Sequence, residues 1–224
     1  MNKLVSKSHW GLVIALGAVW GLSEAALGMG LRNCASLISG SVMTGVALFF
    51  MAVVWTITKR FSGIFVIVLF ASAFKLFDAL LLSLPLKHGA IGNPVFAFFM
   101  EAAAFILIIS LIKEKLKANP AGQALTGGLT AVLAVNLFPL VRHATGVPAC
   151  VVPGGTYPLS LHLIHVAVLV SALLVPLGFS LGAKLVTFEP RLVKTRNATK
   201  ITNALSPAAL FGCLIILMLF RLIS

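Results

Sequence analysis

Acidic residues are scarce in this 224-residue chain, and so are charged residues of any kind. Only five Asp or Glu residues occur, and charged residues make up 10% of the sequence against 60% hydrophobic ones. This composition, with a strongly positive mean hydropathy, exceeds what a soluble core of this size can use. The sequence therefore predicts a polytopic membrane protein, with residues 1–224 forming a single integral membrane domain.

The motifs of soluble enzymes are absent as well. The chain has no serine nucleophile elbow, no phosphate-binding glycine loop and no dinucleotide fingerprint. Its three cysteines contain no CxxC pair, and the sequence leaves open whether Cys34 and Cys150 form a disulfide. The net charge of +12 arises from basic residues between apolar runs rather than from a basic patch with aromatics, so nucleic acid is not indicated as a partner.

What the sequence has instead is long apolar runs, each near the roughly 20 residues that a spanning helix needs. Alternating strand patterns are absent, so the fold class is all-α, a transmembrane helical bundle. Asn93 and Pro94 are typical of a helix start, whereas Ser206 and Pro207 interrupt the last run and leave six to seven spans. The seven runs are Trp10–Gly30, Ser36–Thr58, Gly63–Leu84, Pro94–Ile112, Leu125–Val141, Pro158–Ala183 and Ile201–Ile223.

The basic residues divide unequally between the two sides of these runs. One side holds Lys3, Lys7, Lys59, Arg60, Lys113, Lys115, Lys117, Lys184, Arg191, Lys194, Arg196 and Lys200. The other side holds only Arg32, Lys87, Arg142 and Arg221. Under the positive-inside rule the richer side is cytoplasmic, so we expect a multi-pass protein of the cell membrane with a cytoplasmic amino terminus.

Three acidic residues, Glu24, Asp78 and Glu101, lie inside apolar runs. A carboxylate in hydrocarbon costs at least several kcal/mol, so it usually faces a protein interior or a water cavity and marks a functional site. At about 1.5 Å per residue, these positions lie at nearly the same depth below the outer surface. The residues predicted to share this layer, and to line one outward-opening substrate pocket, are Glu24, Asp78, Glu101, Asn136, His162 and His165.

Structural alternatives stand beside this prediction. Lys75 and Asp78, spaced i, i+3, could neutralise each other as an ion pair. Glu24 could be protonated and hydrogen-bonded to a neighbouring helix, and Asn136 could join two helices. His162 and His165 could complete a divalent metal site with Glu101, or could be neutral and satisfied by interhelical hydrogen bonds.

Small residues recur at four-residue spacing at Gly17, Gly21 and Ala25, and again at Ser41 and Gly45. Such stripes let helix backbones approach closely. The sequence is compatible with two uses of the first stripe: packing within the chain, or docking of a partner helix.

Two segments carry a resemblance to a known family. ALGAVWGLSEAALG (Ala15–Gly28) and GNPVFAFFMEAAAF (Gly92–Phe105) resemble the substrate-capture (S) components of energy-coupling factor transporters. The resemblance implies a small bundle of about six helices with a substrate pocket near the outer face. It also implies an energising membrane subunit that docks on a small-residue helix surface.

Together these patterns favour a transport component that captures a small polar solute or metal ion from the outer side. A divalent metal ion is the cofactor or cargo that the histidines would hold. An intramembrane metal-dependent enzyme, hydrolase or oxidoreductase, is the competing class, and a structural subunit of a membrane complex is the third.

Overall fold

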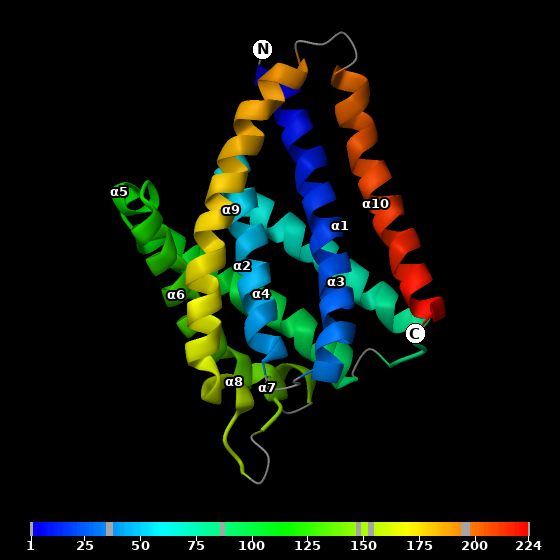
Figure 1. The fold of residues 1–224 in the computed structure, drawn as a ribbon, viewed down its shortest axis with the longest axis vertical. Coiled ribbons are helices and arrows are strands. Elements are labelled where there is room, and N and C mark those ends of the chain that lie inside the picture. The colour runs from blue at the N-terminus through cyan, green and yellow to red at the C-terminus, as the bar shows by residue number, and fades with distance from the viewer. Residues whose placement is uncertain are drawn as a thin grey trace.

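Long apolar runs form helices because a backbone in hydrocarbon must satisfy its hydrogen bonds within its own segment. The computed structural model describes residues 2–34, 38–85, 88–146, 149–151, 155–193 and 198–223, and this part of the chain is a helical bundle (Figure 1). Its only β feature is an isolated bridge between Val151 and Pro158. The helices in chain order are α1 (Asn2–Cys34), α2 (Ser39–Thr58), α3 (Phe61–Leu81), α4 (Gly89–Leu111), α5 (Glu114–Lys117), α6 (Pro120–Leu137), the 3-10 helix η1 (Phe138–Leu140), α7 (Val141–Thr145), α8 (Leu159–His162), α9 (Ile164–Val193) and α10 (Ala198–Ile223).

Six helical segments of the described chain are long and apolar enough to cross a bilayer, which confirms the predicted polytopic bundle. They are Trp10–Leu27, Ser39–Thr58, Phe61–Leu81, Gly89–Leu111, Pro120–Thr145 and Ile164–Thr187. The seventh predicted run corresponds to α10, whose apolar part, Ser206–Leu222, is shorter and contains Pro207. α10 nevertheless runs beside α1 (Figure 1).

Several helix boundaries differ from those expected from sequence, including the starts of α4, α6 and α9. α4 begins at Gly89 rather than Pro94, because the His88 side chain accepts a backbone hydrogen bond at 3.2 Å and caps the first turn. Pro94 therefore lies inside α4, where its missing N–H removes one helical hydrogen bond. The run expected to be one helix from Pro158 is divided at Leu163 into α8 and α9.

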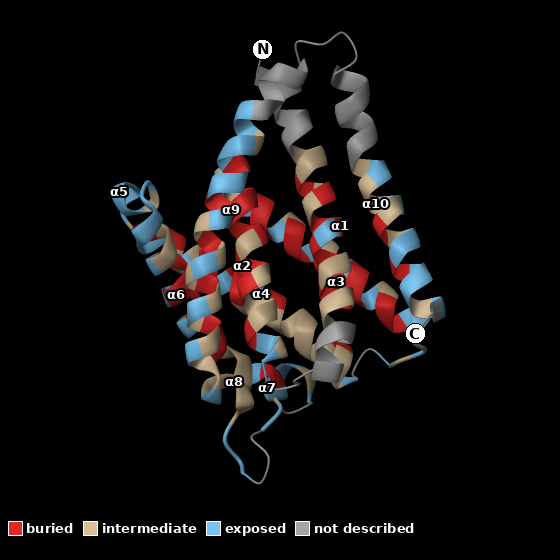
Figure 2. Cartoon of the chain, in the orientation of Figure 1, coloured by how far each residue is buried: buried red, intermediate tan, exposed pale blue. Residues whose placement is uncertain are grey.

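Burial separates an inner core from an apolar outer surface (Figure 2). Among the fully buried core side chains are Trp20, Leu48, Met51, Ile64 and Phe105. On α9 the outward positions Leu169, Leu173 and Leu177 are all exposed. Because these leucines recur every four residues, they form an apolar stripe along one side of the helix, as expected for a surface in contact with lipid.

The small residues of α1 pack within the chain. A Cβ added at Gly17 would lie 2.7 Å from the Cβ of Phe70, and one added at Gly21 would overlap Phe74. Ala25 is buried in a cluster that joins α1, α3 and α10. Packing within the chain thus accounts for the first stripe, and the surface expected as a docking face for a partner helix is covered by α3 and α10.

The second pair of small residues joins α2 to the start of α9. A Cβ at Gly45 would lie 2.5 Å from the Cγ1 of Val170. The Ser41 hydroxyl donates a hydrogen bond of 3.3 Å to the carbonyl oxygen of Leu163. These close contacts hold α2 and α9 together beside the candidate site.

Candidate functional site

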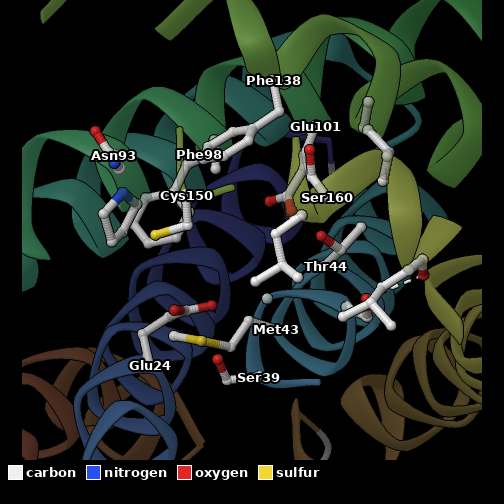
Figure 3. Close-up of a pocket in the computed structure, with 18 of the residues that line it drawn as sticks. Glu24, Ser39, Met43, Thr44, Asn93, Phe98, Glu101, Phe138, Cys150 and Ser160 are labelled. Carbon is white, nitrogen blue, oxygen red and sulfur yellow. Dashed lines mark hydrogen bonds between the residues drawn. The ribbon is translucent and has the colours of Figure 1, made fainter. Parts of the chain in front are cut away.

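A cavity of about 290 Å³ lies at the end of the bundle where α1 ends and α2 and α4 begin. This is the end with few basic residues, which the charge distribution predicts to be outer. Side chains from distant parts of the sequence line it (Figure 3). They include Glu24 of α1, Met43 and Thr44 of α2, Asn93, Phe98 and Glu101 of α4, Val135 of α6, Phe138 of η1, Cys150, and Ser160 of α8.

Glu24 reaches the cavity from α1 and is only 1% exposed. Trp20, one turn earlier on the same helix face, donates its indole N–H to Glu24 Oε1 at 3.3 Å. The Trp20 ring is itself held against Phe98, with ring centroids 5.0 Å apart. The other carboxyl oxygen, Oε2, is buried and has no hydrogen-bond partner. The side-chain hydrogen bond that the structure shows for Glu24 therefore comes from its own helix. The alternative that Glu24 is hydrogen-bonded to a neighbouring helix expected a partner on another helix.

Glu101 reaches the same cavity from α4 and is 5% exposed. Thr44 of α2, which also lines the cavity, lies close to this carboxyl group. As in Glu24, the Oε2 atom is buried without a partner. Figure 3 shows the two carboxyl groups approaching the cavity from different helices.

Unpartnered polar atoms are concentrated at this cavity. Six buried side-chain polar atoms in the described chain lack a hydrogen-bond partner, and four of them belong to the cavity residues Glu24, Asn93, Glu101 and Ser160. Buried polar groups are normally hydrogen-bonded, and each one left unpaired costs about 1–3 kcal/mol. The cavity is therefore the place in the described structure where a bound polar molecule would satisfy the most groups.

Asp78 lies outside the cavity and belongs to a buried ion pair between α3 and α10. Arg221 donates from Nε to Asp78 Oδ1 at 2.6 Å and from Nη2 to Oδ2 at 2.8 Å. Lys75 Nζ lies 3.6 Å from the same Oδ2, which confirms the predicted Lys75–Asp78 pair. Asp78 is thus a structural partner here, because its two oxygens are already occupied by cations.

The remaining predicted site residues point elsewhere. Asn136 is exposed, and its amide donates to the carbonyl oxygen of Val132 on its own helix at 2.8 Å. His162 and His165 are exposed and do not line the cavity. Within the described residues no three His, Cys, Asp or Glu side chains gather as a metal site, so the predicted shell of His162, His165 and Glu101 is not formed. The shared depth of these residues was a poor guide, because the rotation of each helix decides which way a side chain faces.

Sequence reasoning missed several residues of the site. Trp20 and Phe98 hold Glu24 in place, Thr44 lies close to Glu101, and Ser160 supplies a hydroxyl. The i, i+4 spacing of Trp20 and Glu24 is a local signal that could have identified the first of these. Thr44 carried no such signal, because Glu101 lies on another helix.

Cys150 is exposed, lines the cavity and carries a free thiol, so the disulfide considered for it is not formed. The side chain of Cys34 lies outside the described residues.

Comparisons of this chain with family models, with curated proteins and with solved structures found no match.

Proposed function

We propose that this protein captures a small polar solute in the cavity, as a component of a membrane transport system. The observation that carries the proposal is the pair of buried carboxyl groups, Glu24 and Glu101, each with its Oε2 atom buried and without a hydrogen-bond partner. Burying a carboxyl group without a hydrogen-bond partner in an apolar bundle lowers the stability of the protein. A solute that forms a hydrogen bond or ion pair with this group offsets that loss when it binds.

The position of the cavity supports capture from outside the cell. The cavity opens at the end of the bundle with few basic residues, and its described lining combines a few polar groups with a largely apolar wall, as small-molecule sites usually do. The resemblance of Ala15–Gly28 and Gly92–Phe105 to energy-coupling factor S components agrees with this role, since both segments contribute residues to the cavity. An energising subunit would then contact a face other than the buried stripe at Gly17, Gly21 and Ala25.

Binding by matched variants tests the proposal. Glu24→Gln and Glu101→Gln keep the side-chain volume and remove the charge, whereas Glu114→Gln removes an exposed carboxylate that pairs with Lys117 far from the cavity. Mass spectrometry of the gently purified wild-type protein identifies the retained solute, and elemental analysis of the same sample reports any metal. Equilibrium dialysis with that solute should then show binding about thirtyfold weaker in both cavity variants, and unchanged in Glu114→Gln.

The outcomes separate the competing functions. Recovery of the solute unchanged after incubation supports capture, whereas its conversion to a product would favour an enzyme. If both cavity variants bind normally but unfold at lower temperature, Glu24 and Glu101 are interhelical supports and the proposal is wrong.

A further inference from the structure

We propose that the captured solute is a small organic cation, with an ammonium or amidinium group and an apolar body. This inference rests on the proposed function and specifies its substrate class. It is drawn from the charge, the hydrogen-bonding groups and the shape of the cavity.

The charge of the lining favours a cation. Glu24 and Glu101 are close enough to interact electrostatically, and the described lining contains no Lys, Arg or His. Outside the lining, Lys75 of α3 is close enough to Glu24 to interact with it electrostatically, but Lys75 also pairs with Asp78 at 3.6 Å. An anion placed between the two carboxyl groups would be repelled and would find no counter-ion among these residues, so the lining discriminates against it.

The unpartnered atoms favour a ligand rich in donors. Three of the four unpartnered side-chain atoms at the cavity are oxygens that can accept a hydrogen bond but cannot donate one. They are the Oε2 atoms of Glu24 and Glu101, when these groups are ionised, and the Oδ1 atom of Asn93. An ammonium group carries three donors and no acceptor, and an amidinium also presents only donors. Such a head group matches acceptors that come from two different helices, α1 and α4.

The size and the apolar wall favour an organic molecule over a bare metal ion. At about 30 Å³ per water, 290 Å³ holds roughly ten non-hydrogen atoms. Phe98, Phe138, Met43 and Val135 form much of the wall, and aromatic faces attract cations as well as apolar groups. A Ca²⁺ or Mg²⁺ ion would instead need about six or more oxygen ligands, and would leave these apolar side chains without contact.

A series of probes of similar shape and different charge tests the inference. Phenethylammonium and benzamidinium carry a positive head group, phenethyl alcohol is neutral, and hydrocinnamate is negative; Mg²⁺, Mn²⁺ and Zn²⁺ are tested alone. Binding to the purified wild-type protein is measured by equilibrium dialysis. At least one of the two organic cations should bind, the neutral alcohol should bind at least about tenfold more weakly, and hydrocinnamate should not bind.

Binding measurements on cavity variants then test whether the preference for cations arises in the cavity. Glu101→Gln should abolish the advantage of the cation over the neutral alcohol while leaving the weak binding of the alcohol unchanged. Glu24→Gln provides the same test from α1 if Glu101→Gln does not fold, and Glu114→Gln is the control. Failure of both organic cations to bind, or tighter binding of hydrocinnamate or a metal ion, overturns the inference. If in that case the co-purified solute still requires Glu24 and Glu101, solute capture survives and only the substrate class is wrong.

Discussion

Replacing Arg221 by methionine should loosen the attachment of α10 to α3. Arg221 makes two short hydrogen bonds to Asp78, and the two side chains are 10% and 1% exposed. Methionine keeps an apolar stem of similar reach but removes the charge and both hydrogen bonds. The variant therefore tests the ion pair with little change in packing.

The expected loss can be worked from these contacts. Hydrogen bonds to charged groups contribute about 1.5–3 kcal/mol each, and removing one partner of a buried pair costs about 3–5 kcal/mol. Lys75 remains 3.6 Å from Asp78 and keeps it partly compensated, so we place the loss at about 3 kcal/mol, near the lower end. For a chain of this length that corresponds to a fall in Tm of roughly 6–12 °C. Asp78→Asn should cost more, because it leaves both Lys75 and Arg221 without their carboxylate.

Thermal unfolding in detergent measures the global effect, and the native thiol of Cys213 reports the local one. Cys213 is 7% exposed and is buried against α1 and α3, so its reaction with a thiol reagent should be slow in the folded protein. Arg221→Met should speed this reaction, in a background with Cys34→Ser and Cys150→Ser. Arg142→Met, at an exposed arginine on α7, should change neither Tm nor the thiol reaction.

A double-mutant cycle makes the test decisive. Asp78→Asn combined with Arg221→Met should cost less than the sum of the two single changes, because the second change removes a group already left unpaired. Two results would refute the reasoning and show that the pair does not hold α10. One is that the losses of the two single changes add up in the double variant. The other is that Arg221→Met has the same Tm and the same Cys213 reactivity as the starting protein.

Two further predictions concern packing and topology. Gly21→Ala should lower stability by about 1–3 kcal/mol, because the added Cβ would overlap Phe74. Gly212→Ala on α10 is the control: the space around Gly212 is open, so this change should leave stability unchanged or raise it by up to about 1 kcal/mol. Equal effects of the two changes in thermal unfolding would contradict the α1–α3 contact. In a protein without its native cysteines, Tyr157→Cys should react with an impermeant thiol reagent outside intact cells and Lys115→Cys should be shielded, and the reverse pattern would place the cavity on the cytoplasmic side.

The helices could be predicted from the sequence because the constraint that forms them is local. A long apolar run has only its own backbone groups to bond with in hydrocarbon, so six to seven spans could be predicted from hydropathy alone. The described structure has six such helical segments and a shorter apolar one at Ser206–Leu222. The same argument singled out Glu24, Asp78 and Glu101, because a carboxyl group in such a run is rare and costly, and two of these three line the cavity. Local chemistry was less reliable at helix ends: Asn93 and Pro94 have the composition of a helix start, yet His88 caps α4 one and a half turns earlier.

Which polar residues meet was decided only by the tertiary structure. Glu24 and Glu101 face one cavity, whereas Asn136, His162 and His165, at a similar predicted depth, face outward. Asp78 is bound by Arg221, a residue 143 positions away. Depth along a helix follows from residue number, at about 1.5 Å per residue, but the direction of a side chain depends on how the helix is rotated against its neighbours. That rotation is set by packing contacts between distant segments, such as Gly17 against Phe70, which no single run of sequence contains.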